Sequence, residues 1–347
     1  MRNDRLKFKS ELIGVVGAGS WGTSLATLLS SNGHDVVLWC YENELVAELD
    51  LHRQNKKYLP DIYLDEKIRF TNKLEDVFSL PYVLLVSPTQ FSRKIIESGV
   101  DFIQKNSTII SASKGIEQNT LSTMSDVVRN IIPDSLSASY AVLSGPTFAM
   151  EVAQGKPSAV VVASKNIEKA SILQAIFSNS NFRVYTNCDV IGVELAGALK
   201  NVIALAAGIS DGLGYGFNAR AALITRGLAE IRRLGLRCGA LNHTFAGLAG
   251  MGDLVLTCTG ELSRNRYVGI KLGQGMILSD ILAEMSMVAE GVKTTLSAYL
   301  LARKYNVEVP IIEQMYMILN QGKKPQDAVQ ELMKRELRSE DNSDCFL

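Results

Sequence analysis

A single lysine stands in an otherwise apolar stretch of the chain. Between residues 193 and 208 the only charged or amide side chains are those of Glu194, Lys200 and Asn201. A helix of this composition is expected to be buried on nearly every side, and a lysine is rarely fully buried without a partner. Burial lowers the pKa of an ammonium group, which suits a general acid or base. Lys200 is therefore a catalytic candidate, and the alternative is a lysine that extends to the surface.

Helical periodicity indicates which neighbours share a face with one another. Glu194 and Asn201 are separated by two turns of the expected helix, so their side chains lie on one face. We therefore expect Glu194 to lie nearer to Asn201 than to Lys200.

An acid, hydroxyls, an arginine and an amide follow one another later in the chain. Residues 252–259 read Gly-Asp-Leu-Val-Leu-Thr-Cys-Thr, and residues 263–266 read Ser-Arg-Asn-Arg. Arginine and asparagine side chains, together with hydroxyls and backbone N–H groups, form pockets for small phosphates. The alternative is a polar loop that caps a helix and leaves its arginines in solvent.

A glycine-rich loop near the N-terminus predicts a dinucleotide site. Residues 17–22 read Gly-Ala-Gly-Ser-Trp-Gly. In such a loop Gly17 permits a tight turn, Gly19 lets the backbone approach a pyrophosphate, and Gly22 lets helix and strand pack closely. The following helix presents free N–H groups and the positive end of its dipole to the phosphates. The loop lies between an apolar strand and a helix, which is the context that this function requires.

Two further polar segments each follow an apolar strand. The first is Ser111-Ala112-Ser113-Lys114-Gly115, and the second is Ser144-Gly145-Pro146-Thr147. Side chains at the carboxyl ends of parallel strands face the ligand crevice of an α/β fold. Lys114 is therefore a candidate for contact with a substrate oxygen or a cofactor phosphate, and the alternative is a solvated loop lysine.

The elements around these segments alternate between strand and helix. Apolar strands are expected at 12–16, 36–39, 82–86, 108–111, 140–143 and 159–163, and a helix at 24–31 ends at Asn32-Gly33. This alternation predicts an α/β fold, a Rossmann-like, doubly wound and mainly parallel sheet with helices on both faces. After about residue 188 the pattern becomes helical. We therefore expect a dinucleotide-binding domain at 1–190 and an all-helical substrate and catalytic domain at 191–347.

The end of the second strand leaves the cofactor open between NAD and NADP. An acid at this place normally contacts the adenosine ribose, and an arginine nearby holds a 2′-phosphate. The chain has Trp39-Cys40-Tyr41-Glu42. The acid follows the strand late, and no basic residue stands in this segment.

Composition excludes several classes of protein. Lys+Arg and Asp+Glu both number 36, whereas a nucleic-acid binder normally has a basic excess. No apolar run approaches the 18 or so residues of a membrane span, and the short N-terminal run leads into the glycine loop, which favours a strand over a signal peptide. The 5 cysteines form no C-x-x-C pair, and the 3 histidines do not cluster with them. This pattern predicts a cytoplasmic protein with reduced thiols and no metal site.

Taken together, these segments resemble the bacterial-type NAD(P)-dependent glycerol-3-phosphate dehydrogenases over residues 12–335. The likeness is carried by the glycine loop and by several later segments, which are 144–149 (SGPTFA), 194–202 (ELAGALKNV), 218–220 (NAR), 224–227 (ITRG), 252–254 (GDL), 257–259 (TCT), 263–266 (SRNR) and 288–291 (VAEG). Tyr41 departs from the pattern, because many relatives have Arg or His there, and residues 1–9 lie outside the match.

The resemblance implies a reaction and a set of site residues. The reaction is reversible reduction of dihydroxyacetone phosphate to sn-glycerol 3-phosphate, which supplies phospholipid synthesis, in a homodimer with NAD or NADP. Lys200 matches the proton donor or acceptor at the C2 oxygen. Lys114 and Asp253 are expected to orient the substrate carbonyl and Lys200. The implied cofactor-binding residues are Gly17, Gly19, Ser20, Trp21, Gly22, Tyr41, Lys114, Ala149, Arg264, Val288 and Glu290. The implied substrate-binding residues are Lys114, Gly145, Thr147, Lys200, Asn201, Asp253, Thr257, Ser263, Arg264 and Asn265.

Two rival interpretations remain. One is another dehydrogenase with the same two-domain plan, of the 3-hydroxyacid or 6-phosphogluconate type. The Ser-Arg-Asn-Arg segment at 263–266 favours a phosphorylated substrate but does not fix its length. The other rival is a nucleotide-sensing protein without turnover, which would need the glycine loop but neither Lys200 nor Asp253.

Overall fold

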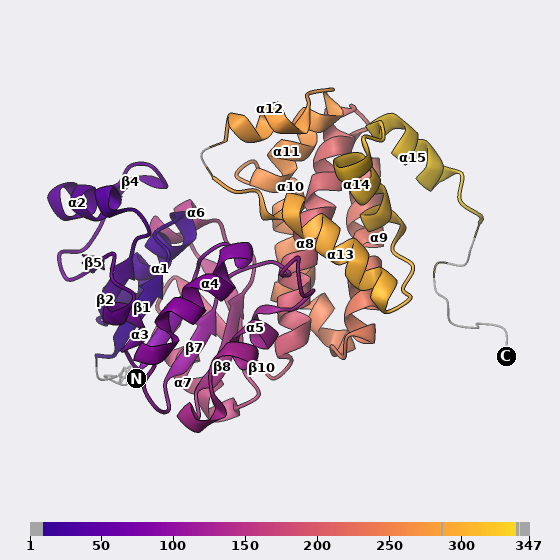
Figure 1. The fold of residues 1–347 in the computed structure, drawn as a ribbon. Coiled ribbons are helices and arrows are strands. Elements are labelled where there is room, and N and C mark those ends of the chain that lie inside the picture. The colour runs from indigo at the N-terminus through magenta and orange to yellow at the C-terminus, as the bar shows by residue number, and fades with distance from the viewer. Residues whose placement is uncertain (1–9, 286, 338–339, 341–347) are drawn as a thin grey trace, which may run out of the picture.

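The computed structural model describes residues 10–285, 287–337 and 340. The expected lead-in before Ser10 and the tail that contains Cys345 lie outside these residues. Figure 1 shows a sheet flanked by helices in the N-terminal half and a cluster of helices in the C-terminal half.

An 8-stranded sheet forms the N-terminal half in the described residues, in the order β10-β9-β8-β7-β6-β1-β2-β5. Strands β5, β2, β1, β6, β7 and β8 run parallel, β9 runs antiparallel to β8, and β10 runs parallel to β9. The strands are β1 Leu12–Val16, β2 Asp35–Trp39, β5 Arg69–Thr71, β6 Tyr82–Leu85, β7 Thr108–Ser111, β8 Ser139–Ser144, β9 Ser158–Ala163 and β10 Phe182–Asn187. The expected mainly parallel sheet is confirmed.

The apolar runs located the central strands because those strands are buried on both faces. Strands β5 and β10, which lie at the two edges of the sheet, were not predicted, and neither was a small hairpin of β3 (Gln54–Asn55) and β4 (Leu59–Tyr63). These strands carry few apolar residues or alternate buried and exposed positions. The expected loop 17–22 is shorter than predicted, since helix α1 already begins at Ser20 and runs to Ser31.

Helices cover both faces of the sheet. One apolar core includes side chains of α1, α2 (Asn43–His52) and α7 (Ile167–Phe177). The other includes side chains of α3 (Glu75–Phe78), α4 (Thr89–Gly99) and α5 (Met124–Ile131). The doubly wound arrangement therefore follows from two separate apolar layers on one sheet.

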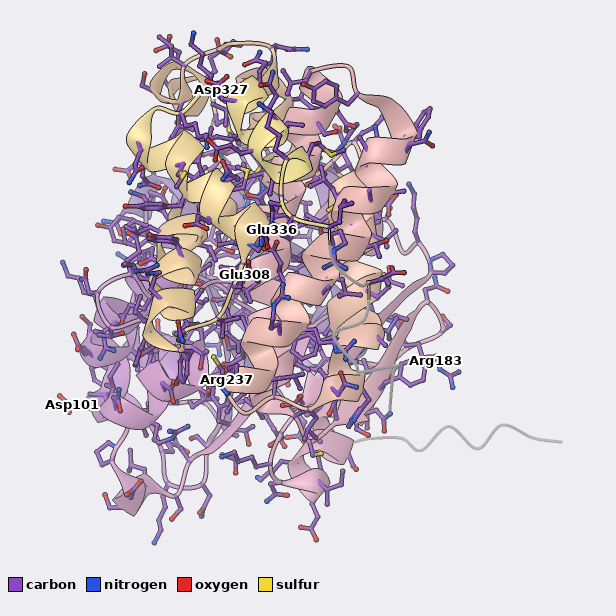
Figure 2. All side chains as sticks on the ribbon, turned by 90° about the vertical axis from the view of Figure 1, so that its right-hand side faces the viewer. Asp101, Arg183, Arg237, Glu308, Asp327 and Glu336 are labelled. Carbon is purple, nitrogen blue, oxygen red and sulfur yellow. The ribbon has the colours of Figure 1, made fainter. Side chains whose placement is uncertain are left out.

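Every element after Asn187 in the described residues is helical. The helices are α8 Val190–Gly212, α9 Gly216–Arg237, α10 Asp253–Thr259, α11 Arg264–Gly273, α12 Leu278–Ala283, α13 Glu290–Lys304, α14 Pro310–Gln321 and α15 Pro325–Met333, and a π-helical turn at Leu248–Gly252 precedes α10. Figure 2 views this half and shows charged side chains of both signs on it, among them Arg237, Glu308 and Asp327.

Helix α8 is the central element of the helical half. Contrary to the sequence-based expectation, it is long and apolar enough to cross a membrane by length and composition. Its most apolar window is, however, 94% buried inside the protein, so α8 is a core helix. Figure 1 shows α8 surrounded by α9, α10, α11 and α13.

Helices α8 and α11 approach so closely that their backbones touch. A Cβ atom at Gly208 would lie 2.1 Å from the carbonyl oxygen of Arg266, and one at Gly269 would lie 2.2 Å from that of Leu205. Gly212 and Gly273 repeat the contact one turn later. Lys200 and Asn201 lie on α8 and Arg264 and Asn265 on α11, so this contact sets the spacing of the functional residues described below.

We predict that Gly208→Ala destabilises the protein. The added methyl group would meet backbone, which cannot swing aside, so the helices must separate. We expect the free energy of unfolding to fall by about 1–3 kcal/mol, as for other overpacked cores, measured by urea denaturation. Gln274→Ala, at an exposed site at the end of α11, serves as the control. Equal stability of the two variants would contradict the close contact.

Candidate active site

The polar segments predicted to act together meet at one edge of the sheet. Gly17 follows β1, Ser87 follows β6, Lys114 follows β7 and Gly145 follows β8, and these strands are parallel. Strand β1 lies between β2 and β6, so the chain order reverses beside the glycine loop. Ligands of open α/β sheets bind at such a switch point, outside the carboxyl ends of the strands.

A buried carboxylate joins two lysines next to this edge. Asp253 is fully buried at the start of α10. Its Oδ1 accepts a hydrogen bond from the Lys200 ammonium at 2.5 Å, and its Oδ2 accepts one from the Lys114 ammonium at 2.8 Å. The structure thus brings the three predicted catalytic residues into direct contact, although they come from a loop after β7, from α8 and from α10.

Both ammonium groups retain a free N–H. Lys200 also donates to Thr257 Oγ1 at 2.7 Å, and Lys114 donates to the carbonyl of Gly145 at 3.2 Å. An ammonium has three donors, and no other described residue accepts the third one of either lysine. Each lysine therefore has one N–H donor available to a ligand.

Lys200 titrates closer to neutrality than an ordinary lysine. Its pKa is lowered to about 8, mainly by burial and also by the nearby charge of Lys114, while the Asp253 carboxylate opposes both effects. A group with such a pKa is present as both acid and base near neutral pH. The burial expected from the apolar helix is confirmed, since Lys200 is 6% exposed.

The glycine loop fits a dinucleotide. Gly17 has a φ of +119°, which a residue with a side chain rarely adopts, and Gly22 packs against the carbonyl of Gly17. A Cβ at Gly19 would meet no atom within 4 Å, so open space lies over the loop at that point. Helix α1 has no side-chain cap, and the buried indole N–H of Trp21 has no partner among the described residues. The loop therefore offers unsatisfied N–H donors toward an open space, as a pyrophosphate requires.

Other predicted cofactor residues surround this loop. The hydroxyl of Ser24 on α1 donates to the carbonyl of Ala149 at 2.8 Å. The Glu290 carboxylate accepts hydrogen bonds from the backbone and hydroxyl of Thr89, which follows β6. Burial raises the pKa of Glu290, and its charge acts on Arg264.

The remaining cofactor candidates lie around the same loop. Ser20 contacts the sulfur of Met287, which places the segment of the half-exposed Val288 beside the loop. Tyr41 is 81% exposed just beyond the end of β2. The predicted cofactor residues thus come from both halves of the chain.

Most of the predicted substrate residues are tied to one another. Asn265 donates to Asn201 at 2.9 Å and accepts from the backbone N–H of Gly291 at 2.9 Å. Ser263 caps helix α11 through the N–H of Arg266. Thr147 donates to the carbonyl of Gly145. The bond between Asn265 and Asn201 positions the start of α11 opposite α8. Within the segment 263–266, the Arg264 side chain is the one that bonds to no described residue.

Two residues of this region have partners that were not predicted. Glu194 bonds to neither Asn201 nor Lys200; its carboxylate accepts from Ser125 at the start of α5 and from the Tyr140 hydroxyl at 2.5 Å. The position of α8 against the sheet, and not its helical periodicity, decides this partner. Arg266 pairs with the Asp211 carboxylate at 2.8 Å, so the alternative that leaves the arginines of this segment in solvent is wrong for Arg266.

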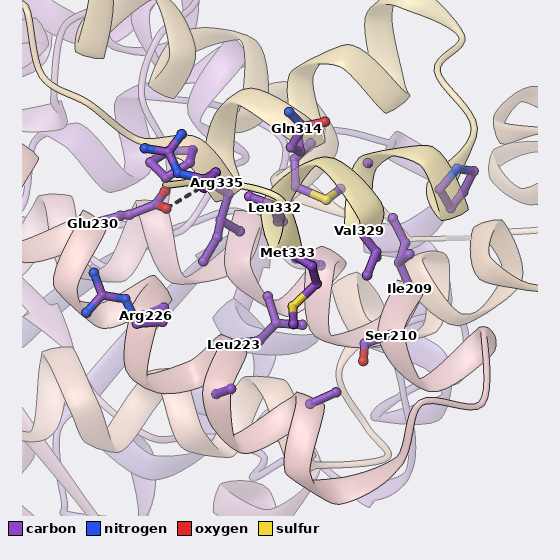
Figure 3. Close-up of a pocket in the computed structure, with 18 of the residues that line it drawn as sticks. Ile209, Ser210, Leu223, Arg226, Glu230, Gln314, Val329, Leu332, Met333 and Arg335 are labelled. Atoms are coloured by element: carbon purple, nitrogen blue, oxygen red, sulfur yellow. Dashed lines mark hydrogen bonds between the residues drawn. The ribbon is translucent and has the colours of Figure 1, made fainter. Parts of the chain in front are cut away.

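A separate cavity of about 480 Å³ lies in the helical half and contains none of the predicted site residues. Figure 3 shows Leu223, Val329, Leu332 and Met333 on its apolar side. Glu230, which no sequence pattern singled out, lies at the polar side, where its carboxylate accepts hydrogen bonds from the backbone N–H groups of Ile311 and Ile312 at the start of α14. Burial raises the pKa of Glu230 to about 7. No sequence signal separates this capping acid from an exposed glutamate.

Comparison with known proteins covers nearly the whole chain. Family models described as the N-terminus and the C-terminus of NAD-dependent glycerol-3-phosphate dehydrogenase match residues 12–170 and 189–330. A glycerol-3-phosphate dehydrogenase (NAD(P)+) of Citrifermentans bemidjiense is 57% identical over 332 residues, which is 95% of this chain and 99% of the relative. One of Bacillus licheniformis is 48% identical and spans 93% of this chain and 94% of the relative.

Solved structures agree with the sequence relatives. The crystal structure of glycerol-3-phosphate dehydrogenase from Coxiella burnetii superposes with a TM-score of 0.90 at 39% identity, covering 94% of this chain and 99% of the other. A D-mandelate dehydrogenase shares the fold alone, with a TM-score of 0.63 at 13% identity over 92% of this chain and 99% of the other. The chain therefore belongs to the NAD-dependent glycerol-3-phosphate dehydrogenase family.

Proposed function

We propose that this chain reversibly reduces dihydroxyacetone phosphate to sn-glycerol 3-phosphate with NADH or NADPH, and so supplies glycerophospholipid synthesis. The observation that carries the proposal is the Asp253 carboxylate between Lys114 and Lys200, at the sheet edge that also bears the glycine loop. Membership of the family supports both the oxidoreductase activity and the nicotinamide cofactor.

The chain supplies the proton and the orientation for this reaction. Bound nicotinamide supplies the hydride equivalent for the carbonyl carbon. In reduction the free N–H of the Lys200 ammonium donates to the carbonyl oxygen and then transfers its proton, and in oxidation the neutral amine accepts that proton. Asp253 fixes the direction of the Lys200 donors, and the free N–H of Lys114 points a second positive charge at the same oxygen. A positioned acid of this kind contributes about 10²–10⁴ in rate.

The start of α11 is the proposed phosphate site. Arg264 stands at the first position of this helix, where backbone N–H groups are free, and its guanidinium bonds to no described residue. Partial desolvation lowers its pKa, which the charge of Glu290 opposes. An arginine at a helix N-terminus binds phosphate well, because directed donors and the helix dipole act together.

Several broader assignments complete the proposal. We assign cofactor binding to residues 1–190 and substrate binding and catalysis to residues 191–347, in a homodimer located in the cytoplasm. The 4 described cysteines are free thiols, which suits a reducing compartment. The assay that separates this enzyme from other dehydrogenases and from a nucleotide sensor is loss of NADH absorbance with dihydroxyacetone phosphate.

We predict that Lys200→Met lowers kcat for reduction by about 10²–10⁴, because the proton donor is lost while the side-chain volume is kept. NADH binding, measured by fluorescence titration, should stay within about threefold of the wild type, since the glycine loop is unchanged. Asp253 keeps its ion pair with Lys114 in this variant. Thermal unfolding therefore serves to check that the variant is folded. Near-normal turnover would exclude Lys200 as the acid.

Arg264→Ala tests the phosphate site separately. We expect the KM for dihydroxyacetone phosphate to rise by about tenfold or more, the loss of a charge-assisted phosphate contact. Arg237→Ala removes an exposed arginine at the end of α9 and is the matched control, with an unchanged KM. If Arg264→Ala also leaves the KM unchanged, the phosphate binds elsewhere.

A further inference from the structure

The segment after β2 lies beside the glycine loop. Val16 of β1 pairs with Trp39 of β2, and the backbone N–H of Gly17 donates to the carbonyl of Trp39 at 3.1 Å. Two residues later the chain reaches the exposed Tyr41, and Glu42 precedes the first turn of α2. In this fold the residues that leave β2 face the adenosine ribose.

A hairpin ties Glu42 to the glycine loop. Asn55 on β3 donates to the carbonyl of Ala18 in the loop at 2.8 Å. The hydroxyl of Tyr58, in the turn between β3 and β4, donates to Glu42 Oε1 at 3.3 Å. The Glu42 side chain remains 37% exposed, so one part of the carboxylate is held and another is open to a ligand.

Three cations belong to the hairpin and to the end of α2 before it. The Lys57 ammonium lies 3.4 Å from Glu42 Oε1 and is paired with it. The guanidinium of Arg53 donates to the carbonyls of Ile68 and Asp65, which hold it in place and leave its charge. Lys56 is exposed on the hairpin.

Negative charge is denser than positive charge around α2. Glu44, Glu48 and Asp50 follow Glu42 along this helix. Burial and, to a smaller extent, the charges of Glu42 and Asp50 together raise the pKa of the Cys40 thiol to about 12, so both carboxylates act on the end of β2. A phosphate on the ribose would therefore meet net repulsion here.

We propose that Glu42 makes this protein select NADH over NADPH, because its carboxylate accepts a hydrogen bond from the free 2′-hydroxyl of the ribose and repels a 2′-phosphate. This inference rests on the proposed function, which left the choice between NADH and NADPH open. Tyr41, at the place where many relatives have a basic residue, adds no charge that would offset this repulsion.

The test is direct binding of both reduced dinucleotides in the absence of substrate. Calorimetric titration should give a Kd for NADPH at least about tenfold above that for NADH. In Glu42→Gln, which keeps the side-chain shape, the ratio should fall by about fivefold or more, mainly through tighter NADPH binding. Glu44→Gln, on the same helical turn and exposed, is the matched control and should leave the ratio unchanged. Thermal unfolding confirms that the variants are folded.

The salt dependence of binding shows independently whether the charge near the 2′-position repels or attracts a phosphate. Salt screens repulsion between exposed charges, so raising the salt concentration should narrow the preference for NADH. If Lys56 or Lys57 instead attracted the 2′-phosphate, added salt would weaken NADPH binding relative to NADH. That result, an unchanged ratio in Glu42→Gln, or equal wild-type affinities would overturn the inference while leaving the proposed function intact. Binding of neither dinucleotide would overturn both.

Discussion

The interaction on which this site depends is the burial of one carboxylate between two ammonium groups. A fully buried carboxylate is strongly disfavoured unless it is paired and hydrogen-bonded. Asp253 satisfies both oxygens, one with Lys200 and one with Lys114. Because the two lysines come from opposite halves of the chain, this pairing fixes the sheet edge against the helices and holds the two ammonium groups on one carboxylate. The pairing with Asp253 also lets the Lys200 ammonium lie in an apolar helix, although burial lowers its pKa.

Helix α8 transmits this geometry through the molecule. Its first turns are held to the sheet by Glu194, whose carboxylate is bound by Ser125 and Tyr140. Its middle carries Lys200, and its last turns touch α11 through glycines. Helix α11 in turn presents Arg264. One core helix of 23 residues, buried along almost its whole length, thereby sets the distance between the proposed proton donor and the proposed phosphate site.

The features that could be predicted from the sequence are those that depend on residues close together in the chain. The glycine loop, the central strands and Lys114 and Gly145 at strand ends need only a few neighbouring residues to be recognised, and the apolar segment around Lys200 predicted its burial. The partners of Glu194, Arg266 and Glu230 could not be predicted, because they lie on distant elements. The ion pairs of Asp253 also bridge distant segments. Strands β3, β4 and β5 are short and lack apolar runs, so they were not predicted. The contact of Tyr58 with Glu42 depends on the hairpin of β3 and β4, so it could not be predicted either.

The central claim is that Lys200 exchanges the proton, with a pKa shifted to about 8 by burial and by Lys114. The ammonium is the donor for reduction and predominates below that pKa, whereas the neutral amine is the acceptor for oxidation and predominates above it. The pH dependence of kcat/KM should therefore be measured in both directions on the same enzyme. We predict that reduction weakens and oxidation strengthens as the pH rises through about 8. Profiles that stay flat in both directions between pH 7 and pH 9 would contradict the account.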